Sequence, residues 1–365
     1  MIGSGEHTSS GIPFFSVGIT TYDRVEMLIE TLHSVLDQTF ADFEIVVGND
    51  NPQRKITAKY LGVNDPRIHF VNHEHNLGEL GNMNALVKIS RGDYFTWLAD
   101  DDLLAPRFLE AMHDALVEFG LPTCAFSSFT NGDRVLVNPA RLPGEARVYS
   151  GSEFLRLYWS GAISAIGTMG AFHREYLART GGLEDLSGGK IALHTEYLHL
   201  VKMGLLEKVV YVNQPLVVYR VHEGSWGCSN TNFEEYKRSG ANLARRSVEY
   251  LRAPELIKDF DQNLTQMLRW LMAEFVAVAR RTPGFHAYNL IGYFLWSRIY
   301  VSSLKGSTLY ERAGRCLLRA EAWLFWVLCK QKFLELAPAP FIKLAYSVRS
   351  LFQRRKGSSV SQVNV

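Results

Sequence analysis

The chain has 365 residues, of which 47% are hydrophobic, and a formal net charge of only +2 at neutral pH. This length leaves room for one large core and a smaller second unit, while the near-neutral charge offers no basic surface and excludes a nucleic-acid partner. The four cysteines show neither zinc spacing nor a disulfide framework, which indicates a reducing, cytoplasmic compartment.

The first hundred residues alternate between strand-like and helix-like segments. An apolar run over 14–19 predicts a strand, and the apolar spacing of three and four over 25–36 predicts an amphipathic helix packed on a sheet. Further apolar runs over 43–48 and 68–71 predict two more strands. This β-α-β-α-β pattern is typical of an open α/β sheet with parallel strands.

Polar residues follow each predicted strand at its carboxyl end. Ligands in open parallel sheets bind where these ends meet. We therefore expect Thr20, Tyr22, Asp50 and Asp100 to converge on one crevice.

Three adjacent carboxylates, Asp100, Asp101 and Asp102, follow the apolar run 94–98, which predicts a buried strand. Like charges this close repel one another, and at the end of a core strand they need a metal ion or a network of donors. The alternative is a solvated acidic turn that only caps the helix expected to begin near Ala105. We call residues 100–102 the acidic cluster.

Five separated motifs occur in a fixed order over roughly residues 12 to 225. They are Thr20-Thr21-Tyr22-Asp23-Arg24, the run from Gln38 to Val47, Asn76-Leu77-Gly78 with Asn82-Met83-Asn84, Arg91-Gly92-Asp93-Tyr94, and the acidic cluster. In this order they resemble the motifs of family 2 glycosyltransferases. The resemblance implies a GT-A fold, which is Rossmann-like with a mostly parallel sheet, and transfer of a sugar from a nucleotide-activated donor. It also implies inversion at the anomeric carbon and a divalent metal, Mg²⁺ or Mn²⁺.

The chain departs from the family pattern at several positions. Thr20 replaces a proline, Asp23 replaces an asparagine and Ala99 replaces the first acidic residue of the cluster. Met83 stands where an arginine is common, which removes one cationic contact to the donor.

Because Ala99 replaces the first acidic residue, the family's metal-binding pair of acids is shifted along the cluster. By the resemblance, Asp101 matches the position that reaches the metal, and Asp100 matches the position nearer the ribose and diphosphate. Asp102 is expected to point towards the following helix.

The donor nucleotide needs a ring to stack on and polar groups to read its base. Tyr22 and Asp50 fit these two roles, although Tyr22 could be a half-buried packing residue and Asp50 an ordinary turn residue before Pro52. The predicted donor-binding set is Thr20, Tyr22, Asp23, Asp50, Asn84 and Asp100.

Inverting transfer needs a general base for the acceptor hydroxyl. The run 191–200 resembles the family's Glu-Asp-x-x-Leu helix start, which makes Glu196 the base, with Thr195 where an acid is usual. A glutamate in the first turn of a helix is also a common helix-dipole residue, and His194 or His199 could serve as the base instead.

The segment 218–227 resembles the family's Tyr-Arg-x-His segment, whose histidine lies near the metal and the diphosphate. This assigns His222 as a second metal ligand, with a surface histidine as the alternative. Mn²⁺ accepts an imidazole nitrogen more readily than Mg²⁺ does.

The last third of the chain reads as successive helices, with an apolar stripe formed by Leu264, Met267, Leu268, Leu271, Met272 and Phe275. Its uncharged runs are too short for a spanning helix. The segments 285–296 and 323–328 are rich in aromatic residues, and basic residues follow them. Two interpretations stay open: a helical subdomain packed on the catalytic core, or amphipathic helices in peripheral contact with a membrane.

These observations predict four parts: a disordered lead-in over 1–11, a GT-A domain over 12–230, a helical region over 231–356 and a disordered tail over 357–365. The lead-in has no apolar core, so no signal peptide is expected.

The predicted function is inverting transfer from a UDP-sugar to a glycan or polyprenyl-linked acceptor in cell-surface polysaccharide synthesis. The predicted location is the cytoplasm, either in solution or at the inner face of the cell membrane. A nucleotide-sugar-binding protein without transferase activity is the alternative from another class. A nucleotidyltransferase would share the crevice and the metal, but no Gly-rich, basic triphosphate loop lies near Thr20.

Overall fold

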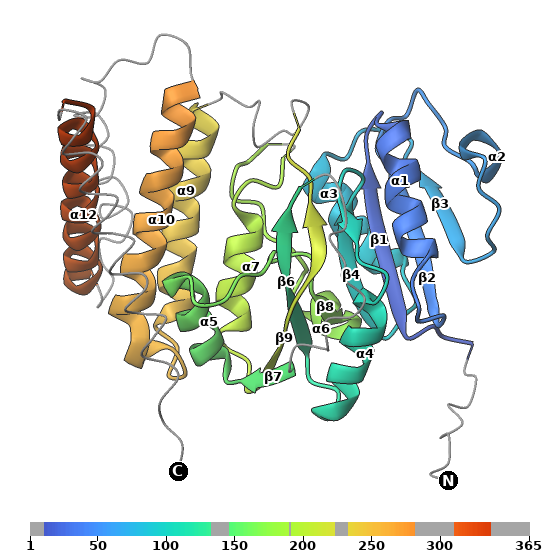
Figure 1. Ribbon diagram of the computed structural model, residues 1–365, viewed down its shortest axis with the longest axis horizontal. Helices are drawn as coiled ribbons and strands as arrows, with labels where there is room; N and C mark the ends of the chain where they lie inside the picture. The colour runs from blue at the N-terminus through green and yellow to red at the C-terminus, as the bar shows by residue number, and fades with distance from the viewer. Residues whose placement is uncertain (1–10, 133–145, 190, 223–232, 282–309, 337–365) are drawn as a thin grey trace.

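The computed structural model of the protein describes residues 11–132, 146–189, 191–222, 233–281 and 310–336. Its centre is a nine-stranded sheet in the order β3-β2-β1-β4-β8-β6-β9-β5, with β7 paired to β9 (Figure 1). The strands are β1 (Phe15–Thr21), β2 (Phe43–Asn49), β3 (Ile68–Asn72), β4 (Tyr94–Ala99), β5 (Leu103–Leu104), β6 (Cys124–Asn131), β7 (Ala146–Tyr149), β8 (Ala171–His173) and β9 (Val209–Tyr219).

The amino-terminal half of the sheet is parallel and has one crossover. β1 pairs in parallel with β2 on one side and with β4 on the other, and β2 pairs in parallel with β3. The chain therefore runs outward through β2 and β3 and then returns to place β4 beside β1. Thr20 lies opposite Ala99 in this register, so the crevice expected at such a crossover opens at the carboxyl ends of β1 and β4.

The second half of the sheet adds antiparallel neighbours. β8 pairs antiparallel with both β4 and β6, while β6 and β9 are parallel to each other. The predicted α/β architecture with a mostly parallel sheet is confirmed.

Helices cover both faces of the sheet, and further helices lie at one end of it. The helices are α1 (Val25–Leu36), α2 (Ala58–Leu61), α3 (Glu79–Ile89), α4 (Phe108–Glu118), α5 (Gly151–Ser160), α6 (Arg174–Arg179), α7 (Thr195–Met203), α9 (Phe233–Leu251), α10 (Phe260–Arg281) and α12 (Tyr310–Leu336). The apolar faces of α1 and α4 bury one hydrophobic core against the sheet, and those of α3, α5, α6 and α7 contribute to a second core. Burial of these faces, rather than local helix propensity, stabilises the helices.

A third core joins the C-terminal helices to the rest of the molecule. The predicted apolar stripe of α10 is buried, as expected, and packs with side chains of α9 and α12. Leu155 and Trp159 of α5, together with Leu198 and Val201 of α7, belong to the same core. Figure 1 shows α9, α10 and α12 side by side beyond α7, at one end of the sheet. The division at residue 230 stays a prediction, and residues 1–10 and 357–365 lie outside the described residues.

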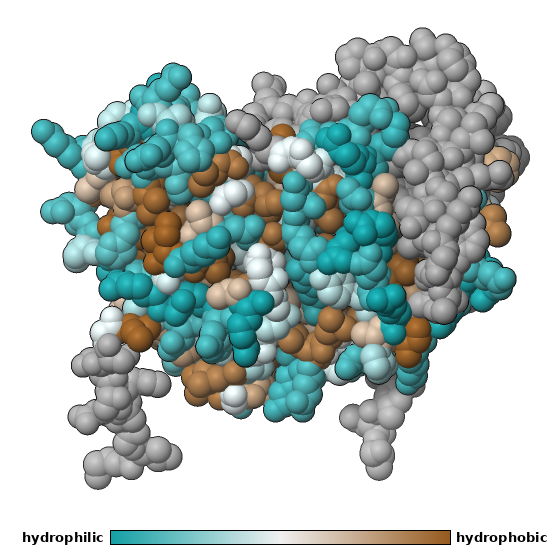
Figure 2. Space-filling view, turned by 180° about the vertical axis from the view of Figure 1, so that it is seen from behind, coloured by the Kyte–Doolittle hydropathy of each residue, from teal (hydrophilic) through white to brown (hydrophobic). Residues whose placement is uncertain are grey.

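Among the helices that the structure describes, none combines the length and the apolar character needed to cross a bilayer. The aromatic segment 285–296 lies outside the described residues, whereas 323–328 lies in α12. Figure 2 shows that the described side chains on the face behind that of Figure 1 are mixed, with hydrophilic groups beside smaller hydrophobic patches.

Candidate active site

A cavity of about 390 Å³ lies at the carboxyl ends of β1 and β4. Of the predicted site residues, Thr20, Asp101 and Glu196 line it, and the other predicted residues lie outside its lining. Two C-terminal helices also reach the cavity, because Tyr236 of α9 and Glu274 of α10 are part of its wall. The site is therefore built from the sheet, from α7 and from the C-terminal helices.

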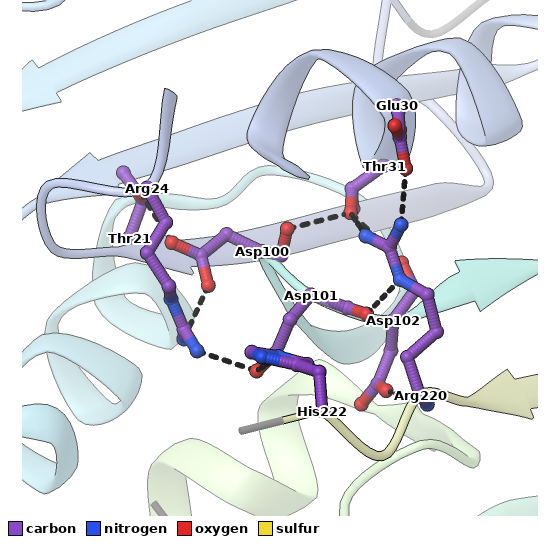
Figure 3. Close-up of polar contacts among 9 residues, drawn as sticks. All are labelled: Thr21, Arg24, Glu30, Thr31, Asp100, Asp101, Asp102, Arg220 and His222. Carbon is purple, nitrogen blue, oxygen red and sulfur yellow. Dashed lines mark hydrogen bonds and ion pairs between the residues drawn. The ribbon is translucent and has the colours of Figure 1, made fainter. Parts of the chain in front are cut away.

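Asp100 is fully buried at the end of β4. The Thr21 hydroxyl donates to its Oδ2 at 2.6 Å, and the Arg24 guanidinium forms an ion pair with its Oδ1 (Figure 3). Thr21 ends β1 and Arg24 follows it, so the crossover in the sheet places both donors beside this carboxylate.

Asp101 points into the cavity and is less buried than its neighbours in the acidic cluster. Its Oδ2 lies 2.5 Å from Nη1 of Arg24 and 3.2 Å from Nε2 of His222. Arg24 thus bridges Asp100 and Asp101, and His222 approaches Asp101 from the segment that follows β9 (Figure 3).

We expected Asp102 to point towards the following helix, α4, and this expectation was wrong. Its Oδ1 accepts the backbone N–H of Arg220 at 2.9 Å, so it fixes the end of β9. The Arg220 side chain donates to the Asp101 carbonyl and forms an ion pair with Glu30 of α1. The Thr31 hydroxyl lies 2.8 Å from the carbonyl oxygens of both Asp100 and Asp102.

Burial of the acidic cluster changes how its carboxylates titrate. Burial raises the pKa of Asp100 to about 6, against the opposing effects of Arg24 and Thr21. Burial raises the pKa of Asp102 to about 8, and the charge of Asp101 acts in the same direction. The alternative of a solvated acidic turn does not fit Asp100 and Asp102, because both are buried.

The residues predicted for donor binding are in different environments. Tyr22 is 54% exposed, as a ring available for stacking would be. Asp23 has a positive φ of 63° and pairs with Arg54 at 2.5 Å. Both are surface positions, and their role in donor binding stays a prediction.

Asp50 and Asn84 make contacts within the protein. Asp50 is buried, and its Oδ1 accepts the N–H of Leu77 at 2.7 Å. The Asn84 amide donates to the Leu183 carbonyl and accepts the Leu183 N–H, each at 2.9 Å. These bonds hold the loops around the crevice, so any contact of these two side chains with a donor would be additional to a structural role.

Glu196 lies in the first turn of α7 and lines the cavity. Burial raises its pKa to about 7; the charges of Glu274 and Glu79 add to this effect, while a hydrogen bond with Tyr197 and the proximity of His194 oppose it. A carboxylate with a pKa near neutrality is suited to accept a proton at physiological pH.

The two histidines considered as alternative bases differ from Glu196. His199 is buried against Trp97 and Phe172, and burial lowers its pKa to about 3. Neither of its ring nitrogens has a hydrogen-bond partner among the described residues. It does not line the cavity, so it is wrongly placed for a base. His194 does line the cavity, but its Nε2 lies 2.7 Å from Oε2 of Glu274.

Gly167 presses against the backbone of Glu196. A Cβ atom at residue 167 would lie 2.4 Å from the Glu196 carbonyl oxygen, which is too close for any side chain. The glycine thus lets the loop before β8 touch the first turn of α7.

The donor atoms at Asp101 and His222 fit a divalent cation in part. Mg²⁺ and Mn²⁺ are commonly held by one or two protein carboxylates together with substrate phosphates, and Mn²⁺ also accepts imidazole. In the described part of the chain, no group of three or more His, Cys, Asp or Glu side chains gathers as a complete ligand set.

Several residues of the site were not predicted from the sequence. Arg24 and Arg220 lie within the sequence motifs, but no role was predicted for either of them. An arginine beside buried acids is the expected counter-charge. Glu79 and Glu274 line the cavity without any sequence signal, because an isolated glutamate on an amphipathic helix is ordinary.

Comparison with known proteins identifies the family. Residues 16–181 match the family model described as glycosyl transferase family 2. A GalNAc(5)-diNAcBac-PP-undecaprenol beta-1,3-glucosyltransferase of Campylobacter jejuni is 26% identical over 218 residues, covering 58% of this chain and 65% of the relative. An uncharacterised glycosyltransferase of Methanocaldococcus jannaschii is 35% identical over 102 residues, covering 27% of this chain and 35% of the relative. The chain spans about a third of the length of several of the curated relatives it matches.

A solved structure agrees on the fold. The structure of S. aureus TarS 1-349 in complex with UDP-GlcNAc has a TM-score of 0.63 at 15% identity, covering 84% of this chain and 87% of that chain. The chain carries a family 2 glycosyltransferase domain with the GT-A fold, as the sequence motifs predicted.

The contact between Gly167 and α7 gives a test of the site's architecture. Gly167→Ala should lower the free energy of unfolding by about 1 to 3 kcal/mol, because the added methyl group must push the loop away from the Glu196 carbonyl. Urea unfolding followed by circular dichroism measures this loss. Ser164→Ala is the control, because Ser164 is an exposed residue of the same loop. Equal stability of the two variants would contradict the close contact.

Proposed function

We propose that the chain transfers a sugar from a nucleotide-diphosphate donor, a UDP-sugar, to a glycan or polyprenyl-linked acceptor, with inversion at the anomeric carbon. The observation that carries this proposal is the single cavity into which both Asp101 and Glu196 open, within a family 2 glycosyltransferase domain. One carboxylate can serve the leaving diphosphate and the other the acceptor hydroxyl.

The choice of donor and acceptor is supported by the similar proteins. The TarS structure was solved with UDP-GlcNAc, and the Campylobacter relative is named for a glycan on undecaprenol diphosphate. A putative colanic acid biosynthesis glycosyl transferase of Escherichia coli, 29% identical over 99 residues, supports a role in cell-surface polysaccharide synthesis. It covers 27% of this chain and 36% of the relative.

The donor would lie across the carboxyl ends of β1, β2 and β4. In the proposal, Tyr22 stacks on the base, Asp50 reads its polar edge, and Asp100 lies near the ribose and diphosphate. Thr20 lines the cavity beside them, and Asp23 and Asn84 flank the donor. The exposed ring of Tyr22 supports its role, because a stacking platform must be accessible to the ligand.

Asp101 and His222 are the proposed metal ligands. When bound, a divalent cation stabilises the negative charge that develops on the leaving diphosphate. Arg24 contacts the same Asp101 oxygen that His222 faces, so a cation held there would compete with this contact. The Arg24 guanidinium would also be available to the diphosphate, for which its planar donors are well suited.

Glu196 is the proposed general base. It accepts the proton of the acceptor hydroxyl as that oxygen attacks the anomeric carbon, while the bond to the diphosphate breaks on the opposite face. A single displacement of this kind inverts the configuration.

A nucleotide-sugar-binding protein without transferase activity is the alternative, and it would need fewer catalytic groups in the site. Binding alone does not require a carboxylate whose pKa lies near 7 on the cavity wall. Turnover of UDP-sugars with a panel of glycan and lipid-linked acceptors separates the two functions. Release of UDP that depends on the acceptor supports transfer, and tight donor binding without turnover supports the alternative.

Membrane contact is the proposed role of the exposed side of α12. Leu318 and Phe325 are 63% and 61% exposed, seven positions apart and therefore on one face of the helix. Arg315 and Arg319 are on the same helix, and aromatic or aliphatic groups beside arginines are typical of an interfacial helix. A polyprenyl-linked acceptor would place the enzyme at the inner face of the cell membrane.

The first prediction from the proposed function concerns the metal. Asp101→Asn should weaken Mn²⁺ binding in the presence of UDP by about tenfold or more, because it replaces a charged ligand by a neutral one. Isothermal titration calorimetry measures this affinity, and transfer should fall in parallel. Asp93→Asn, at the other end of β4, is the matched control. Unchanged Mn²⁺ affinity in Asp101→Asn, or full activity in EDTA, would remove Asp101 from this role.

The second prediction concerns the base. Glu196→Gln should keep donor affinity but slow transfer by about 10² to 10⁴, the usual contribution of a positioned base. Since the base must be deprotonated, wild-type kcat/KM should rise as pH increases through about 7, and this rise should be absent in the variant. Glu175→Gln is the control, because Glu175 occupies the first turn of α6, outside the cavity. NMR of the product should show inversion, and a retained configuration would contradict the mechanism.

The third prediction concerns the membrane. Leu318→Ser combined with Phe325→Ser should reduce sedimentation with anionic phosphatidylglycerol vesicles, and wild-type sedimentation should weaken as salt rises. These substitutions are better than truncation within α12, because Ala320 and Leu324 are part of a buried core. Val117→Ser on α4, which replaces another exposed apolar residue, is the control. Equal partitioning of all three proteins would leave α12 only its packing role.

A further inference from the structure

Glu274 belongs to α10 in the C-terminal helical region, yet its side chain lines the cavity that contains Asp101 and Glu196. Its Oε2 lies 2.7 Å from Nε2 of His194. A helix outside the matched family segment therefore holds a residue of α7's N-terminus.

The His194 side chain is completely buried among aromatic rings. The rings of Tyr197, Tyr236, Trp270 and Phe275 surround it, with centroids about 6 Å away. The Nδ1 atom of His194 has no hydrogen-bond partner in the described structure, so the bond at Nε2 satisfies the polar side of this ring. Losing that bond would leave a second buried nitrogen unsatisfied, which is unfavourable.

His194 also has a backbone conformation that needs support. Its φ is 61°, in the left-handed region, which is unfavourable for a residue other than glycine. It is the N-cap residue of α7, and its carbonyl accepts the N–H groups of Tyr197 and Leu198. The direction in which α7 begins, and with it the position of Glu196 two residues later, depends on this conformation.

We propose that Glu274 is a positioning residue that holds the His194 ring and thereby fixes the first turn of α7 in the geometry that Glu196 needs. This inference rests on the proposed function for its effect on transfer. It makes the C-terminal helices part of the catalytic unit, because α10 supplies the anchor. Glu274 acts through His194, and Gly167 lies against the Glu196 backbone, so two separate segments contact the first turn of α7.

The kinetic test uses two substitutions of Glu274 in the full chain. Glu274→Ala should lower kcat by about tenfold to a hundredfold with donor KM unchanged, because small displacements of a reacting group have effects of this size. Glu274→Gln keeps an oxygen that can accept the His194 N–H and should recover most of kcat. Glu249→Ala on α9 is the control, because Glu249 pairs with Arg245 and Arg246 away from the cavity. Loss of kcat in Glu274→Gln equal to that in Glu274→Ala would overturn the positioning role in favour of a direct role of the charge.

A double-mutant comparison tests whether the effect passes through His194. If it does, His194→Ala combined with Glu274→Ala should be no slower than His194→Ala alone. Additive losses would mean that Glu274 acts on the substrate independently, and would overturn the proposal.

A readout without activity separates this proposal from the proposed function. Hydrogen exchange of the Tyr197 and Leu198 amides, measured by mass spectrometry of the wild type and the variants, reports on the first turn of α7. Exchange should become faster in Glu274→Ala and stay near the wild-type rate in Glu274→Gln and Glu249→Ala. Unchanged exchange in a folded Glu274→Ala protein would overturn the proposal even if the wild type transfers no sugar. If the wild type transfers no sugar but exchange is still faster in Glu274→Ala, the positioning role is supported and only the proposed function fails.

Discussion

Burial of the acidic cluster at the end of β4 is the constraint on which the rest of the site depends. Asp100 and Asp102 are both removed from water, and a buried carboxylate without partners would cost several kcal/mol. Each finds its partner on a different element: Arg24 and Thr21 come from the end of β1, and the N–H of Arg220 comes from the end of β9. The cluster therefore links segments that are more than a hundred residues apart in the sequence.

The strand order makes this arrangement possible. Because β4 lies directly beside β1, the donors that follow β1 lie against the acids that follow β4. Thr31 of α1 adds a hydroxyl beneath the cluster, and the Arg220 side chain reaches over it to Glu30 of the same helix. The opposite wall has a separate origin, since α7 packs in one core with the C-terminal helices. The cavity is thus the space between a wall fixed by charge pairing and a wall fixed by apolar packing.

The sequence was sufficient for several elements of the amino-terminal part and for the acidic cluster. Alternating apolar runs and helical spacing located β1, α1, β2, β3 and β4, and adjacent carboxylates after an apolar strand indicated the candidate site. The sequence was insufficient for contacts between distant segments. Nothing in the residues near Asp102 indicates that its partner is Arg220, and the core environment of His199 follows only from the packing of Trp97 and Phe172 around it. Glu274 is a further case, because its neighbours in the sequence form an apolar stripe while its own side chain faces the cavity.

The charges around the acidic cluster bear on how a metal and a diphosphate would enter the proposed site. Arg24 pairs with Asp100 and Asp101, and Arg220 pairs with Glu30, so both arginines have acidic partners without any ligand. A divalent cation held by Asp101 would share an oxygen that Arg24 contacts, and a diphosphate alone would meet the carboxylates of the cluster. With both ligands present, Arg24 would be able to donate to the phosphate oxygens, for which its planar guanidinium is suited. Under the proposed function, the arrangement of Arg24 therefore favours binding of the metal and the nucleotide as one unit over binding of either alone.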